Sequence, residues 1–279
     1  MPFRNILVQL STYPVRTPDN VLSAALKIAD MLGGQVTAAI CKVDMPKTSN
    51  KLAMLLTDLS VAIAEAERDS EIAVRELEDL LMRANAGRYQ PIETLTFHWF
   101  ADVRASGLIG RARLSDLIIV PITPYPVFHD LAQEVIFGSG RPVLLLPAKV
   151  PEQISLEVVV VAWDGSRVAG RAISDAMPLL NFAHTVRLVE ITGDKPLDGS
   201  SSIAALRDHL LSHDIKAVID TVPAEGSSAG VVLAAYCSRH HADLLVMGAY
   251  GHSRIRDFVM GGATQHFVDD TLLPVLLSH

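Results

Sequence analysis

The sequence predicts an α/β protein with two repeated domains, each built around a doubly wound parallel sheet of five strands. Apolar segments of strand length alternate with amphipathic segments of helical period along most of the 279 residues. The same order of segments occurs in both halves of the chain. Continuous apolar strands that alternate with helices are typical of a parallel sheet with both faces covered.

Each half opens with an apolar strand, at residues 6–10 (Ile-Leu-Val-Gln-Leu) and at residues 158–163 (Val-Val-Val-Val-Ala-Trp). An amphipathic helix follows each strand. Its apolar face contains Val21, Leu22, Ala25, Ile28, Ala29 and Leu32 in the first half, and Ala169, Ile173, Ala176, Met177 and Leu180 in the second.

The ends of the two halves also match. Residues 116–120 (Asp-Leu-Ile-Ile-Val) parallel residues 243–247 (Asp-Leu-Leu-Val-Met), and Pro-Val-Leu-Leu occurs at both 142–145 and 274–277. We therefore expect domains at 1–148 and 154–279, joined by a linker between Pro147 and Pro151. The last strands are apolar edges that need covering, so the two domains are expected to pack through them as an intramolecular pseudo-dimer.

A long helical segment at about residues 45–90 distinguishes the first half. Its predicted apolar face consists of Leu52, Leu55, Leu59, Ile63, Ala66, Ile72, Leu77, Leu80 and Leu81. One interpretation is a helix or helix pair that covers its own sheet. The other is an inserted surface that binds a partner or a second copy.

Composition excludes several classes of protein. The net charge is −7 and no dense basic run occurs, which disfavours nucleic-acid binding. No apolar run approaches the roughly 18 residues that span a bilayer, and the N-terminus has no signal-peptide pattern. We expect a cytoplasmic protein without membrane contact. Cys41 and Cys237 are expected to be buried thiols.

The second half contains a glycine-rich loop directly after the apolar strand at 243–247. Gly248 and Gly251 are followed by Gly261 and Gly262, and a helical pattern begins just after them. Glycine permits positive φ and a close approach of backbone N–H groups to an anion, and a helix N-terminus adds a positive dipole end. This arrangement predicts a phosphate-binding loop.

The pattern Gly248-x2-Gly251-x9-Gly261, with the tail at 273–277, resembles the ATP-binding signature of the universal stress protein family. The resemblance implies a Rossmann-like fold of the adenine-nucleotide alpha hydrolase type, here in tandem. It also implies ATP as ligand, with ADP or AMP and Mg²⁺ as further candidates. One departure is Gly262, where the family usually has Ser or Thr; the first hydroxyl of this chain comes at Thr264.

The resemblance implies contacts to the nucleotide from several strands. Asp164 would contact adenine or ribose, while Ile191 and Met247 would pack on the base. The remaining predicted contacts are Ala162, Gly248, Gly251, His252, Arg254, Gly261, Gly262, Ala263 and Thr264. Other interpretations stay open: Asp164 or Ser166 could cap the following helix, Ile191 and Met247 could be core residues, and Arg254 could be a solvated loop cation.

Catalytic and metal-binding patterns are weak. His252 and Ser253 are adjacent, but the Gly-x-Ser-x-Gly elbow is absent and no acid is evidently placed to orient the histidine. His209 and His213 lie four apart without a recognisable third ligand, so no metal site is expected. We expect no catalytic residues and a protein that is not an enzyme, although slow ATP hydrolysis could accompany binding.

The first half lacks the glycine loop. Pro121 and Pro124 stand where the second half has Gly248 and Gly251, and proline has no N–H to donate. We therefore expect a nucleotide site in the second domain only.

Two functions follow from these patterns. The first is a nucleotide-binding stress-response or signalling module that acts on an unidentified protein partner and could form a homodimer. The alternative is an interaction protein that binds no nucleotide and acts through the long helix of the first half.

Overall fold

The computed structural model describes residues 3–43, 57–99, 106–150, 154–193, 202–249, 262–269 and 271–279. The first half contains β1 (Asn5–Ser11), α1 (Asp19–Leu32), β2 (Gln35–Val43), α2 (Thr57–Asn85), β3 (Glu93–Trp99), α3 (Ser106–Ala112), β4 (Leu117–Ile122), α4 (Pro126–Ser139) and β5 (Val143–Pro147). The second half contains β6 (Val158–Ala162), α5 (Arg167–Leu180), β7 (Thr185–Thr192), α6 (Ile203–Leu211), β8 (Ala217–Pro223), α7 (Ala229–Arg239), β9 (Leu244–Gly248), α8 (Gly262–Asp269) and β10 (Val275–Ser278).

The strands of both halves form one sheet with the order β3-β2-β1-β4-β5-β10-β9-β6-β7-β8. Pairs within each half are parallel, and each half has the same doubly wound order of five strands. The predicted α/β fold class is confirmed. The domain boundaries at 148 and 154 stay a prediction, and residues 151–153 of the predicted linker lie outside the described residues.

The two halves meet through their last strands. β5 and β10 pair in antiparallel fashion, with Val275 opposite Leu145 and Leu277 opposite Val143. These four side chains are fully buried. The predicted pairing of apolar edge strands is therefore confirmed, and each strand supplies the backbone partners that the other would otherwise lack.

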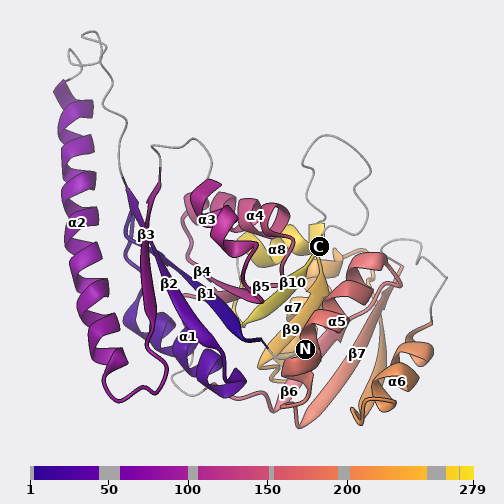
Figure 1. Ribbon diagram of the computed structural model, residues 1–279. Coiled ribbons are helices and arrows are strands. Elements are labelled where there is room, and N and C mark those ends of the chain that lie inside the picture. The colour runs from indigo at the N-terminus through magenta and orange to yellow at the C-terminus, as the bar shows by residue number, and fades with distance from the viewer. Residues whose placement is uncertain are drawn as a thin grey trace.

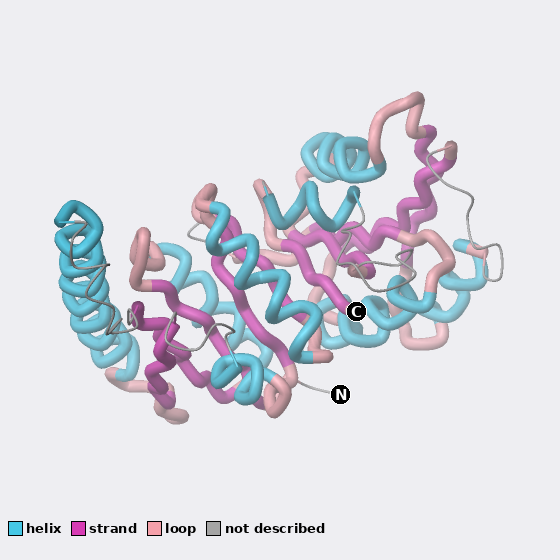
Figure 2. Tube along the Cα trace, turned by 90° about the horizontal axis from the view of Figure 1, so that it is seen from above, coloured by secondary structure: helices cyan, strands magenta, loops and turns pink. Residues whose placement is uncertain are grey.

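Helices cover both faces of the sheet, as the view from above shows (Figure 2). Side chains of α1, α2, α5 and α6 pack in one core on one face, and those of α3, α4, α7 and α8 pack in a second core on the other. The buried strands alternate between these cores, which explains why their sequences are apolar without interruption. No helix within the described ranges combines the length and apolar character needed to cross a membrane.

From residue 57 onward, the long segment of the first half contains helix α2 of 29 residues, which lies beside β3 at one end of the sheet (Figure 1). Its inward face contains Ala66, Ser70, Ala73, Leu77 and Leu81, all buried. The described part of α2 therefore covers its own sheet, and the Thr12 and Ser70 hydroxyls, 2.7 Å apart, link it to the end of β1.

One predicted member of this apolar face is wrong. Ile72 is 49% exposed, because the spacing 66, 70, 73, 77 and 81 selects a face to which position 72 does not belong. Leu52 and Leu55 lie outside the described residues, as does the side chain of Leu59.

Both cysteines are buried free thiols, as predicted. Cys41 is in β2 and Cys237 is in α7. Burial raises the pKa of each thiol to about 12.

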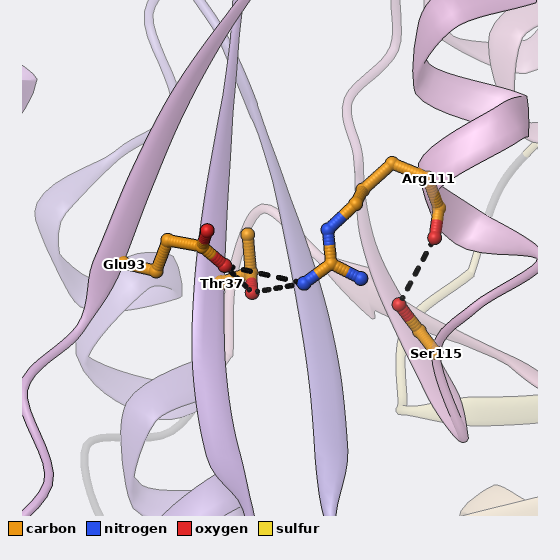
Figure 3. Close-up of polar contacts among 4 residues, drawn as sticks. All are labelled: Thr37, Glu93, Arg111 and Ser115. Carbon is orange, nitrogen blue, oxygen red and sulfur yellow. Dashed lines mark hydrogen bonds and ion pairs between the residues drawn. The ribbon is translucent and has the colours of Figure 1, made fainter.

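A polar cluster ties the edge strand β3 to its neighbours (Figure 3). Thr37 Oγ1 on β2 donates to Glu93 Oε2 on β3 at 2.8 Å. Arg111 Nη2 on α3 donates to the same two oxygens, at 2.8 and 3.2 Å. The hydrogen bond from Thr37, followed by that from Arg111, lowers the pKa of Glu93 below its ordinary value.

This cluster predicts a pH-dependent contribution to stability. Glu93→Gln should lower the free energy of unfolding by no more than about 1 kcal/mol at neutral pH, because the ion pair is partly solvated. The folded-state pKa of Glu93 is depressed, so the carboxylate's contribution is fully present above about pH 5 and is lost as the pH falls through the folded-state pKa. Urea unfolding of wild type and of Glu93→Gln, from neutral pH to below the folded-state pKa of Glu93, measures the difference in the free energy of unfolding.

Glu78→Gln on the exposed face of α2 is a matched control, and its effect should not change over the same pH range. A difference between wild type and Glu93→Gln that grows as the pH is lowered would contradict this assignment.

Candidate functional site

The carboxyl ends of β9, β6 and β7 are neighbours in the sheet, and they bring Met247, Ala162 and Ile191 together. All three pack on the core under α7 and α8. Met247 is buried, whereas Ala162 and Ile191 are only half-buried. The result is a partly open apolar patch at the switch point of a doubly wound half, which is where such sheets bind ligands.

Asp164 follows this patch and orders the turn before α5. Its Oδ1 accepts a hydrogen bond from the Ser166 N–H at 2.9 Å, across Gly165, whose φ of 77° is left-handed. Ser166 Oγ in turn accepts from the Ala169 N–H at 3.2 Å. Ser166 is therefore the N-cap of α5, as the sequence suggested. Contact of Asp164 with adenine or ribose stays a prediction.

Gly248 ends β9 where the strand approaches the first turn of α5. A Cβ at this position would lie 2.7 Å from both the Ala169 nitrogen and the Val168 carbonyl carbon. Backbone atoms cannot move aside as the end of a flexible side chain can. Gly248 is required by this close packing, independently of any phosphate.

Helix α8 begins at Gly262, close to the predicted start. Gly262 is exposed, and a Cβ there would meet no atom within 4 Å. Ala263 is half-buried, while Thr264 is 3% exposed on the same inward face as Phe267 and Val268. The inward face of α8 is therefore packed, whereas the side-chain position of Gly262 at its start is open.

The remaining predicted phosphate contacts, Gly251, His252, Arg254 and Gly261, lie outside the described residues. The amide of Ala249, one residue after Gly248, donates to the Ser278 carbonyl at 2.7 Å. That N–H therefore takes part in the pairing of β9 with β10.

In the described part of the chain, no three His, Cys, Asp or Glu side chains are grouped so that they could hold a metal ion. His209 and His213, the pair considered from the sequence, lie on and just after α6 with ring centroids 5.0 Å apart.

Solved structures match this architecture over nearly its whole length. A universal stress protein from Archaeoglobus fulgidus matches 98% of this chain and 97% of its own, with a TM-score of 0.66 and 14% identity. The chain has the fold of the universal stress proteins. A functionally unknown protein from Pseudomonas aeruginosa matches 99% of this chain and 92% of its own, with a TM-score of 0.57 and 16% identity.

A universal stress protein in complex with cAMP matches 52% of this chain and 98% of its own, with a TM-score of 0.31 and 16% identity. Protein-family models give no match to the sequence, and neither do curated proteins.

The two halves of this universal stress protein fold can be compared through their strand registers. Val8 lies opposite Ile119 as Val161 lies opposite Val246, so that Gln9 corresponds to Ala162 and Ser11 to Asp164. The registers of β1 with β2 and of β6 with β7 make Cys41 correspond to Ile191. Gln9, Ser11 and Cys41 are at most 3% exposed.

Hydrogen bonds link the buried polar side chains at these positions of the first half. Gln9 Nε2 donates to Ser11 Oγ at 2.8 Å, and the Ser11 N–H donates to Thr17 Oγ1 at 2.8 Å. Gln9 Oε1 has no hydrogen-bond partner among the described residues. A buried Gln at the position equivalent to Ala162 distinguishes the first half from the second.

The loop of the first half has diverged as well. Pro121 is a residue of β4 opposite Leu146, and α4 begins at Pro126, only four residues after β4 ends at Ile122. In the second half the interval between β9 and α8 runs from residue 249 to 261. The first half therefore has buried side chains at the equivalent positions and fewer residues between the strand and the equivalent helix.

The sequence did not identify Gln9, Ser11 or Gly230 as important. A Cβ at Gly230 in α7 would lie 2.7 Å from His266 Cβ in α8, so this glycine lets the two helices pack closely. A polar residue in the otherwise apolar segment at 6–10 was the available signal for Gln9.

The different surroundings of two glycines predict opposite effects of the same substitution. Gly248→Ala should lower the free energy of unfolding by about 1–3 kcal/mol, because the methyl group would overlap the backbone of α5. Gly262→Ala should leave it unchanged or raise it slightly, since the methyl group enters open space at a helix start. Thermal unfolding monitored by circular dichroism measures both. Equal stability of Gly248→Ala and wild type would show that β9 and α5 are not in this close contact.

Proposed function

We propose that this chain is a universal stress protein that binds one adenine nucleotide, with ATP as the expected ligand, in its second domain. The observation that carries the proposal is the apolar patch of Ala162, Ile191 and Met247, in which Ala162 and Ile191 are half-buried. The equivalent positions in the first half are filled by buried side chains. A purine base needs a flat apolar surface with a few polar groups at its rim, and Asp164 provides one such group.

Each part of the nucleotide has a proposed neighbour. The base packs on the apolar patch, and the Asp164 carboxylate accepts a hydrogen bond from the base or the ribose. The phosphates extend toward Gly251 and Gly261 and toward the N-terminus of α8, where backbone N–H groups and the helix dipole favour negative charge. Magnesium would be held mainly by the phosphates.

We propose binding rather than turnover as the activity. In this proposal no side chain activates water, and nucleotide occupancy alters the affinity for a protein partner during a stress response. Slow hydrolysis, where it occurs, would then be a side reaction of the bound nucleotide.

A second candidate function rests on the outward face of α2. Val61, Ile72 and Met82 are 55%, 49% and 66% exposed on this helix. Under this alternative the protein acts by contact through α2 and binds no nucleotide. The two candidates are separated by whether the wild-type protein binds ATP.

The proposal predicts one nucleotide per chain. It also predicts that the nucleotide site is lost when Gln9 of the first half is copied into the equivalent position of the second half. Ala162→Gln places the side chain of Gln9 at the equivalent position of β6, where it would occupy the space of the base. Affinity for ATP should fall by about tenfold or more, equal to about 1.4 kcal/mol or more. Isothermal titration calorimetry with ATP, with and without Mg²⁺, measures both stoichiometry and affinity.

Ala162→Ser is the matched control, because it adds a polar atom with little volume and should keep the affinity of wild type. Two nucleotides per chain, or an unchanged affinity in a correctly folded Ala162→Gln, would contradict the proposed site. Absence of ATP binding by wild type would reject nucleotide binding and favour the α2 alternative.

A further inference from the structure

The side chain of His129 lies between the two halves of the molecule, with an acceptor at each ring nitrogen. Its Nε2 is 2.9 Å from the Thr123 carbonyl oxygen in the first half. Its Nδ1 is 3.3 Å from Asp269 Oδ1 in the second half. The Thr123 carbonyl and the Asp269 carboxylate are both hydrogen-bond acceptors, and they belong to different halves of the chain.

This contact is shielded from water on one side. The His129 side chain is 13% exposed, and that of Asp269 is 47% exposed. Gln265 Nε2, one turn earlier in α8, donates to the same Asp269 oxygen at 2.5 Å. Asp269 is thus oriented by its own helix, toward a histidine of the other half.

Helix α8 depends on such contacts for its position. It has eight residues, too few for a stable helix without tertiary packing. Phe267 and Val268 bury its inward face, and close packing at Gly230 fixes it against α7. On the other side it lies next to α4 of the first half (Figure 1), where His129 holds its last residue, Asp269.

The contact of His129 with Thr123 involves the loop after β4. Thr123 is the first residue after β4, so it lies in the loop that corresponds to the glycine loop of the second half. This loop has Pro124 where the second half has Gly251, and its Thr123 carbonyl contacts the histidine. The side chain of His129 therefore connects Thr123, in the loop after β4, with Asp269 in α8.

We propose that His129 is a positioning residue through which the first domain sets the orientation of α8 and thereby the nucleotide affinity of the second domain. The affinity part rests on the proposed function. The positioning part concerns the protein without nucleotide and can be measured separately.

Three substitutions separate the two contacts of the ring. The amide nitrogen of Asn takes the place of Nδ1, so His129→Asn keeps a donor for Asp269. The amide nitrogen of Gln takes the place of Nε2, so His129→Gln keeps a donor for Thr123 only. His129→Ala removes both, and Asp130→Ala, an exposed neighbour on α4, is the matched control.

The first measurement is hydrogen exchange of the nucleotide-free proteins. Amides of α8 should exchange faster in His129→Gln and His129→Ala than in wild type, His129→Asn or Asp130→Ala. Amides of α6, distant in the second domain, should not change and report an intact fold. Unchanged exchange of α8 in His129→Ala, or equal loss of protection in His129→Asn and His129→Ala, would overturn the positioning role.

The second measurement is ATP affinity under the same conditions. His129→Gln and His129→Ala should bind ATP about fivefold more weakly or worse, as expected for a coupling between distant groups, and His129→Asn should bind as wild type does. Equal affinity of all variants would overturn the link to the site even where exchange of α8 changes. If wild type binds no ATP, the proposed function and the affinity part fail together, while the exchange data still decide the positioning part.

Discussion

The antiparallel pairing of β5 with β10 is the contact on which the rest of the molecule depends. Both strands are short, apolar and fully buried at their paired residues, and neither could be left as a solvated edge. Their pairing turns two five-stranded halves into one continuous sheet. It also places α4 of one half beside α8 of the other, a contact that neither half could form alone.

The differences between the two halves lie away from the junction of β5 with β10. The crevices lie at the carboxyl ends of β1 and β6, whereas the halves are joined at β5 and β10. In the first half the position equivalent to Ala162 is occupied by the buried side chain of Gln9. In the second half Ala162 is smaller and the patch stays partly open. Both halves keep the same strand order, so the difference between them lies in side chains and loop length.

The fold was predictable because its signals are local. Apolar strands, helical periodicity and repeated segments such as 116–120 and 243–247 each follow from neighbouring residues, and the apolar last strands predicted their own pairing. The difference between Gln9 and Ala162 could not be predicted in this way. These two residues are recognised as equivalent only when the strand registers of the sheet are known. The contact of His129 with Asp269 joins residues far apart in the chain, so no spacing rule applies. Ile72 shows the remaining weakness: on a long helix an apolar residue can lie outside the buried face.

The most direct test of the account is a crystal structure of the full chain grown with saturating ATP and Mg²⁺. The account predicts one nucleotide per chain, with its base against Ala162, Ile191 and Met247 and its phosphates at the start of α8. The crevice around Gln9 and Ser11 should contain no nucleotide. A base bound beside Gln9, or a second domain without nucleotide under these conditions, would contradict the claim that this protein has a single nucleotide site formed by its second half.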